Sequence, residues 1–171
     1  MLTILGIDPG SRITGYGLIW VKGSEQGCVT YGHIQTQAEQ MSDRLYEIYS
    51  RLSQIIQEHC PTEAAIEQVY MHQNVQSALK LGQARGALFI ALASQQLPVS
   101  EYSPREIKQA VVGYGASSKE QVQQMVTTLL KLKKGIQADA ADALAVALCH
   151  ANSRLLKERL KNAKLSAGEG S

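Results

Sequence analysis

Residues 4–15 read ILGIDPGSRITG and place one acid, Asp8, at the end of a short apolar run. The run predicts a buried strand over Leu2–Asp8, and the Pro-Gly-Ser sequence at 9–11 predicts a turn. The next apolar run predicts a second strand over Thr14–Val21, antiparallel to the first. Asp8 then has two interpretations. It begins the turn, or the buried strand holds it as a ligand for a metal or a phosphate.

The rest of the chain alternates between strand and helix patterns after a third strand over Val29–Thr36. We expect helices over 41–59 and 75–95, strands over 63–69 and 98–102, a helix from 104, a helix over 119–132 and an Ala-rich helix over 138–151. This order predicts an α/β fold with a mixed five-stranded sheet flanked by helices. The first three strands should be antiparallel and the later ones parallel, as in a ribonuclease-H-like domain.

Length and composition are those of one globular domain, with 171 residues, 44% hydrophobic residues and a net charge of +2. That net charge does not by itself indicate a nucleic-acid partner, but basic residues gather locally. Near the C-terminus a single acid, Glu158, faces five basic residues: Arg154, Lys157, Arg159, Lys161 and Lys164.

Nothing in the sequence predicts a membrane protein. The N-terminus has no basic segment of a signal peptide, and the most apolar stretch, GALFIALAS, is too short to cross a bilayer. The three cysteines form no CxxC motif, which favours reduced thiols. We therefore expect a cytoplasmic protein with no membrane partner.

Four acids stand at the ends of apolar elements: Asp8, Glu67, Asp139 and Asp142. The last two are three residues apart, which places both on one face of the Ala-rich helix. Acids in such surroundings are costly unless a cation offsets them, and the nearby basic residues, Arg12, Lys133 and Lys134, are few. Converging carboxylates would suit Mg²⁺ or Mn²⁺, and two such ions support phosphoryl chemistry.

Each acid also has an ordinary structural interpretation. Asp8 could only initiate a turn, Glu67 could face solvent at a strand end, and Asp139 could be a helix N-terminal acid favoured by the dipole. Their combination in a ribonuclease-H-like order of elements favours a metal site.

Five segments resemble, in order and in spacing, the successive motifs of the RuvC family of bacterial Holliday-junction resolvases. They are GIDPGSRITGYG, AIEQVYM, SALKLGQARG, VVGYGASSKEQVQ and QADAADALAVA, spread between Leu2 and Ala151. The resemblance implies a ribonuclease-H-like nuclease domain over residues 1–152. Residues 153–171 would then be a basic, flexible C-terminal tail.

The same resemblance implies the chemistry. It makes Asp8, Glu67, Asp139 and Asp142 a catalytic cluster that binds two Mg²⁺ ions per subunit, with Mn²⁺ as a substitute. A homodimer would nick a four-way DNA junction symmetrically, leaving 5′-phosphate and 3′-hydroxyl ends for recombination and repair. The RuvA–RuvB branch-migration complex is the implied partner.

Four further residues are expected to contact DNA. Tyr70 stands where the family often has Phe, an aromatic that stacks on a base, although a half-buried core aromatic is the alternative. Lys108 and Lys119 match basic positions of the family, and Lys119 follows a glycine-containing loop at a helix N-terminus, which suits a phosphate. Solvated surface charges are the alternative for both lysines. Arg12, just after Asp8, completes the set.

The helix over 75–95 carries Gly82 and Gly86 four residues apart. Small residues at this spacing usually indicate core packing, whereas the resemblance makes part of this face a dimer contact that suits a two-fold symmetric junction.

Two other functions fit parts of the pattern. In actin-like ATPases and sugar kinases, too, an Asp-x-Gly sequence follows an apolar strand, but these proteins need two such domains around a cleft. A protein that binds junctions without cutting them is the second alternative, and the four acids argue against it.

Overall fold

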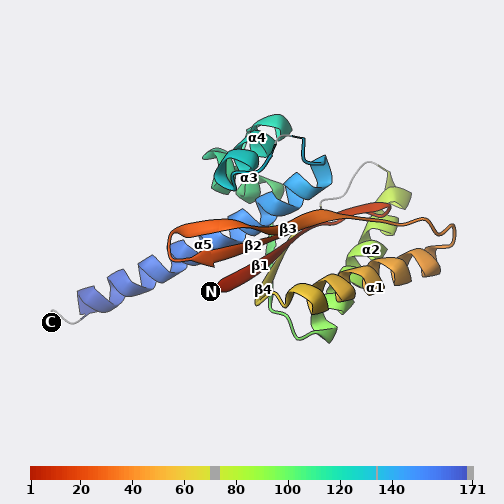
Figure 1. Ribbon diagram of the computed structural model, residues 1–171, viewed down its shortest axis with the longest axis horizontal. Helices are drawn as coiled ribbons and strands as arrows, with labels where there is room; N and C mark the ends of the chain where they lie inside the picture. The colour runs from red at the N-terminus through yellow and green to blue at the C-terminus, as the bar shows by residue number, and fades with distance from the viewer. Residues whose placement is uncertain (70–73, 134, 169–171) are drawn as a thin grey trace.

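A five-stranded mixed sheet, in the order β3-β2-β1-β4-β5, lies between two layers of helices in the computed structural model (Figure 1). The structure describes residues 1–69, 74–133 and 135–168, with side chains as far as residue 161. The strands are β1 (Leu2–Asp8), β2 (Ile13–Lys22), β3 (Glu25–Gln35), β4 (Glu63–Glu67) and β5 (Val99–Tyr102). The helices are α1 (Met41–His59), α2 (Val75–Ser94), α3 (Pro104–Val112), α4 (Lys119–Leu129) and α5 (Ala138–Gly168).

The pairing of the strands confirms the expected sheet. β1, β2 and β3 form an antiparallel meander, and β4 and β5 add in parallel on the other side of β1. The turn at 9–11 is closed by the buried side chain of Thr14, whose hydroxyl donates to the carbonyl of Gly10 at 3.0 Å. In this register Asp8 stands opposite Gly15 of β2.

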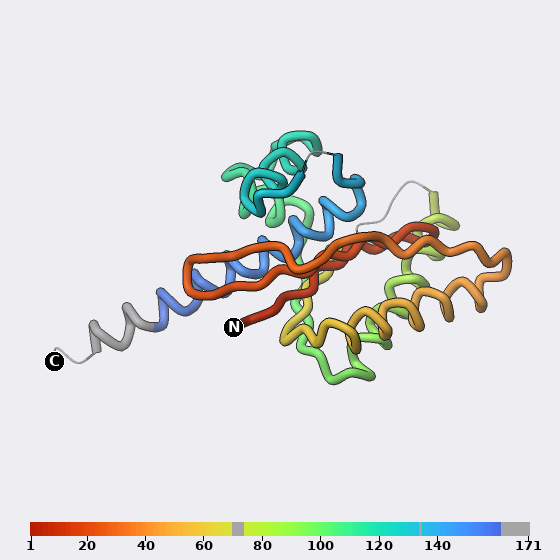
Figure 2. Tube along the Cα trace, viewed as in Figure 1, coloured from red at the N-terminus to blue at the C-terminus, as the bar shows by residue number. Residues whose placement is uncertain are grey.

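The two faces of the sheet pack against different helices, as the trace in Figure 2 shows. Alternation along β1 directs Leu5 and Ile7 into one core with α1 and α2. Ile4 points to the opposite face, into a second core with α3, α4 and α5. Asp8, an even number of residues from Ile4, therefore belongs to the face that α5 covers.

Helix α5 approaches the sheet closely because glycines face it. A Cβ on Gly6 would lie 2.1 Å from the carbonyl oxygen of Ala143, and one on Gly17 would lie 2.6 Å from Leu144. At Gly15 a Cβ would lie 2.0 Å from the backbone oxygen of Asp139. The missing side chains let the helix backbone rest directly on β1 and β2, which brings the first turns of α5 beside Asp8.

Short helices at the rim begin at well-formed caps. The side chains of Ser103 and Ser118 each accept a backbone N–H three residues on. Their own backbone N–H groups donate to side-chain oxygens of Glu106 and Gln121, which completes two capping boxes. The N-terminal cap of α4 is therefore Ser118. Pro104 opens α3 as its first residue, as expected.

The structure decides between the alternatives for Gly82 and Gly86 and extends one helix beyond its expected end. Gly82 and Gly86 do not pack in the core, since a Cβ on either would meet nothing within 4 Å, and the small residues that α2 buries are Ala84, Ala87 and Ala91. The Ala-rich helix also continues beyond residue 151, because the next residues favour helix and no glycine occurs before Gly168. The flexible tail expected over 153–171 stays a prediction.

Replacing Gly6 with Ala should destabilise the fold by more than about 3 kcal/mol, because the added methyl would overlap the backbone of α5. Gly23→Ala is the control: that residue lies at φ 61° in an open turn, so only backbone strain of about 1–2 kcal/mol is expected. Urea unfolding followed by circular dichroism measures both. Equal losses for the two variants would contradict the close packing of α5 on β1.

Candidate active site

The carboxyl ends of β1 and β4 place two acids side by side. Ile7 pairs with Ile66 in parallel register, so Asp8 and Glu67 emerge next to each other, and their side chains are hydrogen-bonded. Asp142, one turn into α5, faces both. The three acids line a cavity of about 280 Å³ together with Pro104, Ile107, Lys108, Lys119, Val122 and Ala145.

The cavity concentrates negative charge in a poorly solvated place. Burial, together with the charges of Glu67 and Asp142, raises the pKa of Asp8 to about 8. Burial also raises the pKa of Glu67, and the charge of Asp142 adds to the effect. Without a further cation, therefore, the Asp8–Glu67 pair favours holding a proton near neutral pH.

A lysine partly offsets this charge. The Nζ atom of Lys119 lies 2.6 Å from a carboxylate oxygen of Asp142. The bond to Asp142 raises the pKa of Lys119, and the charges of Asp8 and Asp139 act in the same direction. Ser118 caps α4 directly before this lysine, so the cap determines where the ammonium group enters the cavity.

This ion pair was not expected from the sequence. The sequence indicates Arg12, Lys133 and Lys134 as neighbours of the acids because they are close in the chain. Arg12 and Lys133 do not line the cavity, and Lys134 lies outside the described residues. The lysine that does pair with an acid comes from a separate helix, and only the tertiary fold brings it there. Lys108 reaches the cavity from α3, and its charge lowers the pKa of Glu67 against the effect of burial.

The other expected site residues lie in different places. Asp139 is half-buried in the first turn of α5, where its backbone packs on Gly15, and it does not line the cavity although its charge reaches Lys119. The side chain of Arg12 is exposed on the loop between β1 and β2. Tyr70 lies outside the described residues.

The donors at the cavity suit a hard divalent cation. Carboxylate oxygens are the ligands that Mg²⁺ and Mn²⁺ prefer, and the raised pKa of Asp8 reflects negative charge that a cation would offset. Within the described part of the chain, however, no three acidic, His or Cys side chains already stand around one point. Asp142 is held by Lys119. An ion that binds Asp142 would thus have to replace Lys119 as the partner of this carboxylate.

Comparison with known proteins places this chain in a family. The model of the family described as "Crossover junction endodeoxyribonuclease RuvC" matches residues 4–150. The chain belongs to the RuvC family. A RuvC from Coxiella burnetii is 61% identical over 161 residues, which cover 94% of each chain. A RuvC from Acinetobacter baumannii is 57% identical over 153 residues, covering 90% of this chain and 84% of that one.

Solved structures agree with this membership. The RuvC of Thermus thermophilus in complex with its Holliday junction substrate superposes with a TM-score of 0.86 at 32% identity, covering 92% of this chain and 97% of that one. The yeast mitochondrial Holliday junction resolvase shares the fold, with a TM-score of 0.67 at 15% identity over 95% of this chain and 83% of the other.

Across the residues that the structure describes, no helix combines enough length with enough hydrophobicity to cross a bilayer.

The crowding of acids predicts a pH-dependent cost to stability in the metal-free protein. The pKa of Asp8 rises from about 3.8 in the unfolded chain to about 8 in the folded one, so the folded state binds more protons and loses stability as pH rises between these values. Asp8→Asn removes the carboxyl group and therefore this loss of stability with rising pH. Thermal scans should show the variant several degrees more stable than the parent at pH 8, where each kcal/mol corresponds to about 2–4 °C.

That difference should shrink as the pH falls and vanish below a pH of about 3.8, where Asp8 of the parent is protonated in both states. A difference independent of pH, or a less stable variant at pH 8, would contradict the assigned electrostatics.

Proposed function

We propose that this RuvC-family chain is a crossover junction endodeoxyribonuclease that resolves Holliday junctions. The observation that carries the proposal is the cavity at the ends of β1 and β4, where Asp8, Glu67 and Asp142 meet two lysines. The curated relatives bear the name of this activity, and the Thermus thermophilus relative was solved with a Holliday junction as its substrate.

The acids are assigned to metal binding, with Asp8, Glu67, Asp139 and Asp142 as the ligand set. Metal dependence is a property of the family, and two Mg²⁺ ions per subunit, replaceable by Mn²⁺, are our proposal for this chain. Bound ions supply the Lewis acidity that activates a water and stabilises the leaving oxygen of a phosphodiester. Asp139 lies one turn before Asp142 at the start of α5, so a modest rotamer change would turn it toward the same ions.

The chain's own groups then orient the substrate. Asp8 and Glu67 are fixed by the ends of buried strands, so they hold their positions with little loss of side-chain freedom. Lys119 and Lys108 enter the cavity from two helices and can contact the oxygens of the reacting phosphate. Water adds to phosphorus, its proton passes to the departing 3′ oxygen, and the products are a 5′-phosphate and a 3′-hydroxyl.

Two further DNA contacts are proposed. Tyr70, just beyond β4, would stack on a base near the cut, and Arg12, exposed after β1, would contact a phosphate. Phosphate contacts of this kind weaken as salt is added, so junction binding should decrease with ionic strength. Such a protein would work in the cytoplasm, where the DNA of bacteria lies.

A homodimer is the proposed active form, since a junction with two-fold symmetry needs two equal sites. One side of α2 has the features of a dimer interface. Leu79 and Ile90 are 64% and 63% exposed, and Gly82 and Gly86 between them leave open space that a second helix could fill. In cells the RuvA–RuvB complex would deliver the junction to this dimer.

The proposal predicts that Asp8→Asn separates binding from cutting. The variant should bind a four-way junction like the parent, because the change leaves the lysines and the fold intact, but cleave it at least about 1,000-fold more slowly. The assay uses a mobile junction, a linear duplex of the same sequence and Mg²⁺, with strands resolved on denaturing gels.

Paired symmetric nicks on the junction alone are the expected result for the parent protein. Unimpaired cutting by Asp8→Asn would exclude the assigned site. Hydrolysis of ATP by the parent without DNA would instead favour a relative of the actin-like ATPases.

The dimer surface has its own test. Ile90→Glu should convert the dimer to a monomer in sedimentation experiments, because a charge would be buried between the two α2 helices. Val29→Glu, at another exposed apolar residue, on β3, is the matched control and should leave the dimer intact. A dimer that persists with Glu at residue 90 would exclude this face as the interface.

A further inference from the structure

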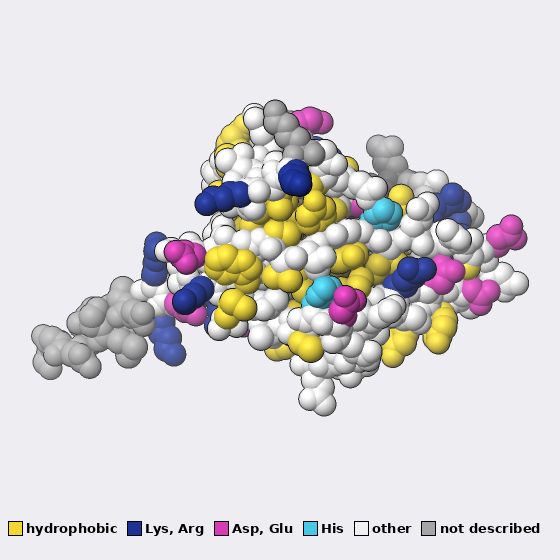
Figure 3. Space-filling view, viewed as in Figure 1, with side chains coloured by type: hydrophobic (Ala, Val, Ile, Leu, Met, Phe, Trp, Pro, Cys, Tyr) yellow, Lys and Arg dark blue, Asp and Glu magenta, His cyan; other side chains and the backbone are white. Residues whose placement is uncertain are grey.

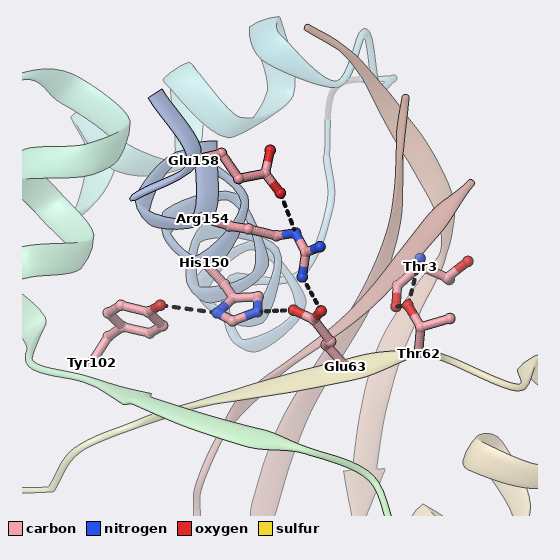
Figure 4. A network of polar contacts seen from close by, with 7 residues as sticks. All are labelled: Thr3, Thr62, Glu63, Tyr102, His150, Arg154 and Glu158. Carbon is pink, nitrogen blue, oxygen red and sulfur yellow. Dashed lines mark hydrogen bonds and ion pairs between the residues drawn. The ribbon is translucent and has the colours of Figure 1, made fainter. Parts of the chain in front are cut away.

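A second polar cluster joins α5 to β4 and β5, and the proposed catalysis does not use it. Figure 4 shows His150 of α5 between Tyr102 of β5 and Glu63 of β4. Its Nδ1 atom lies 2.9 Å from the Tyr102 hydroxyl and its Nε2 atom 2.7 Å from a carboxylate oxygen of Glu63. Arg154, one turn further along α5, pairs with the other oxygen of Glu63 and lies 3.4 Å from Glu158.

The ionisation of Glu63 fixes the direction of its hydrogen bond with the imidazole. Burial would raise the pKa of Glu63, but its bonds to His150 and Arg154 prevail and lower it, so the group is a carboxylate that only accepts. Burial raises the pKa of Tyr102, which keeps its proton. Nε2 of His150 therefore donates to Glu63, and Nδ1 forms a hydrogen bond with the hydroxyl of Tyr102. His150 is only 7% exposed, and both of its ring nitrogens are bonded.

The spacing of this cluster matches the spacing of the proposed active site. Glu63 and Glu67 lie on the same face of β4, four residues and about 13 Å apart. Asp142 and His150 are eight residues apart on α5, a rise of about 12 Å. The helix and the strand run in opposite directions. Glu67 therefore lies beside Asp142 at one end of the contact between them, and Glu63 lies beside His150 at the other end. Both contacts form together in one register of α5 on the sheet.

Tyr102 links the cluster to another wall of the cavity. In the register of β4 and β5, Tyr102 stands opposite Glu67, and its backbone carbonyl accepts the N–H of Gln68 at 2.8 Å. The chain then passes through the Ser103 cap into α3, which carries Lys108. His150 thus contacts the strand that bears Glu67 and the strand that leads to Lys108, while its own helix bears Asp142.

We propose that His150, Glu63 and Tyr102 are positioning residues for the nuclease: they hold α5 in the register that brings Asp142 to Asp8 and Glu67 at a spacing suited to divalent cations. This inference rests on the proposed function. It assigns metal affinity in part to side chains that touch neither metal nor DNA.

The experiment measures binding of Mn²⁺ to the full chain without DNA by titration calorimetry, alongside cleavage kinetics. Tyr102→Phe removes one hydroxyl and Glu63→Gln one charge, so both variants should fold. We expect each to raise the dissociation constant for Mn²⁺ by about 3–10-fold and to lower kcat at saturating metal, while KM for the junction changes less than twofold. His150→Leu should show a larger effect, and His150→Gln, which keeps a donor for Glu63, should recover part of it.

Thr62→Val is the matched control. Thr62 precedes Glu63 and exchanges two hydrogen bonds with the backbone of Thr3, at 2.8 and 3.0 Å, so its loss weakens the same end of the sheet without touching α5 (Figure 4). This variant should lose a similar amount of thermal stability and bind Mn²⁺ like the parent.

Variants of the cluster that lose stability but bind Mn²⁺ like Thr62→Val would overturn the positioning role. Different results would contradict the two proposals. A parent protein that leaves junctions uncut contradicts the nuclease assignment, whereas the comparison of Mn²⁺ binding tests the positioning role without any cleavage.

Discussion

The contact on which the rest of this structure depends is that of α5 with the glycine-lined face of β1 and β2. Gly6 and Gly17 are partners in the antiparallel ladder. The backbone of α5 at Ala143 fills the space of a side chain at Gly6, and the side chain of Leu144 fills that at Gly17. With larger residues there the helix would stand off, and Asp142 would not reach the acids at the strand ends. Close packing of a helix on a sheet is thus what converts acids distant in sequence into one site.

That packing has an electrostatic consequence. It places Asp142 beside Asp8 and Glu67, where burial and like charge oppose ionisation. Lys119 offsets only part of this charge through its bond to Asp142. The fold therefore keeps a locally unfavourable arrangement, and the hydrophobic cores on both faces of the sheet supply the stability that allows it. A cation that binds would relieve the strain and add to stability.

Much of the fold could be predicted from sequence because its signals are local. Apolar runs, Pro104 and the serine caps determine where strands and helices lie, and the strand over Leu2–Asp8 and the helix over Met41–His59 have the predicted bounds. Asp8, Glu67 and Asp142 could be predicted to converge because all three end or begin apolar elements of a known order. The partner of Asp142 could not, since Lys119 is distant in sequence and nothing local links them.

The same limit explains two other differences. Gly82 and Gly86 have the spacing of core-packing residues, but spacing does not show which side of a helix faces the sheet, and this side faces away. The cluster around His150 was not anticipated because its members come from three elements. Figure 3 shows one face of the molecule, where hydrophobic side chains gather along the middle and Lys and Arg lie mainly toward the margins. Such surface patterns also arise only in three dimensions.

The matched spacing along α5 and β4 constrains how the gene can change. Inserting or deleting one residue between Asp142 and His150 would turn the two ends of the helix by about 100° relative to each other and shift them by about 1.5 Å. One contact would then form only at the expense of the other. The length of this stretch of the protein therefore cannot drift.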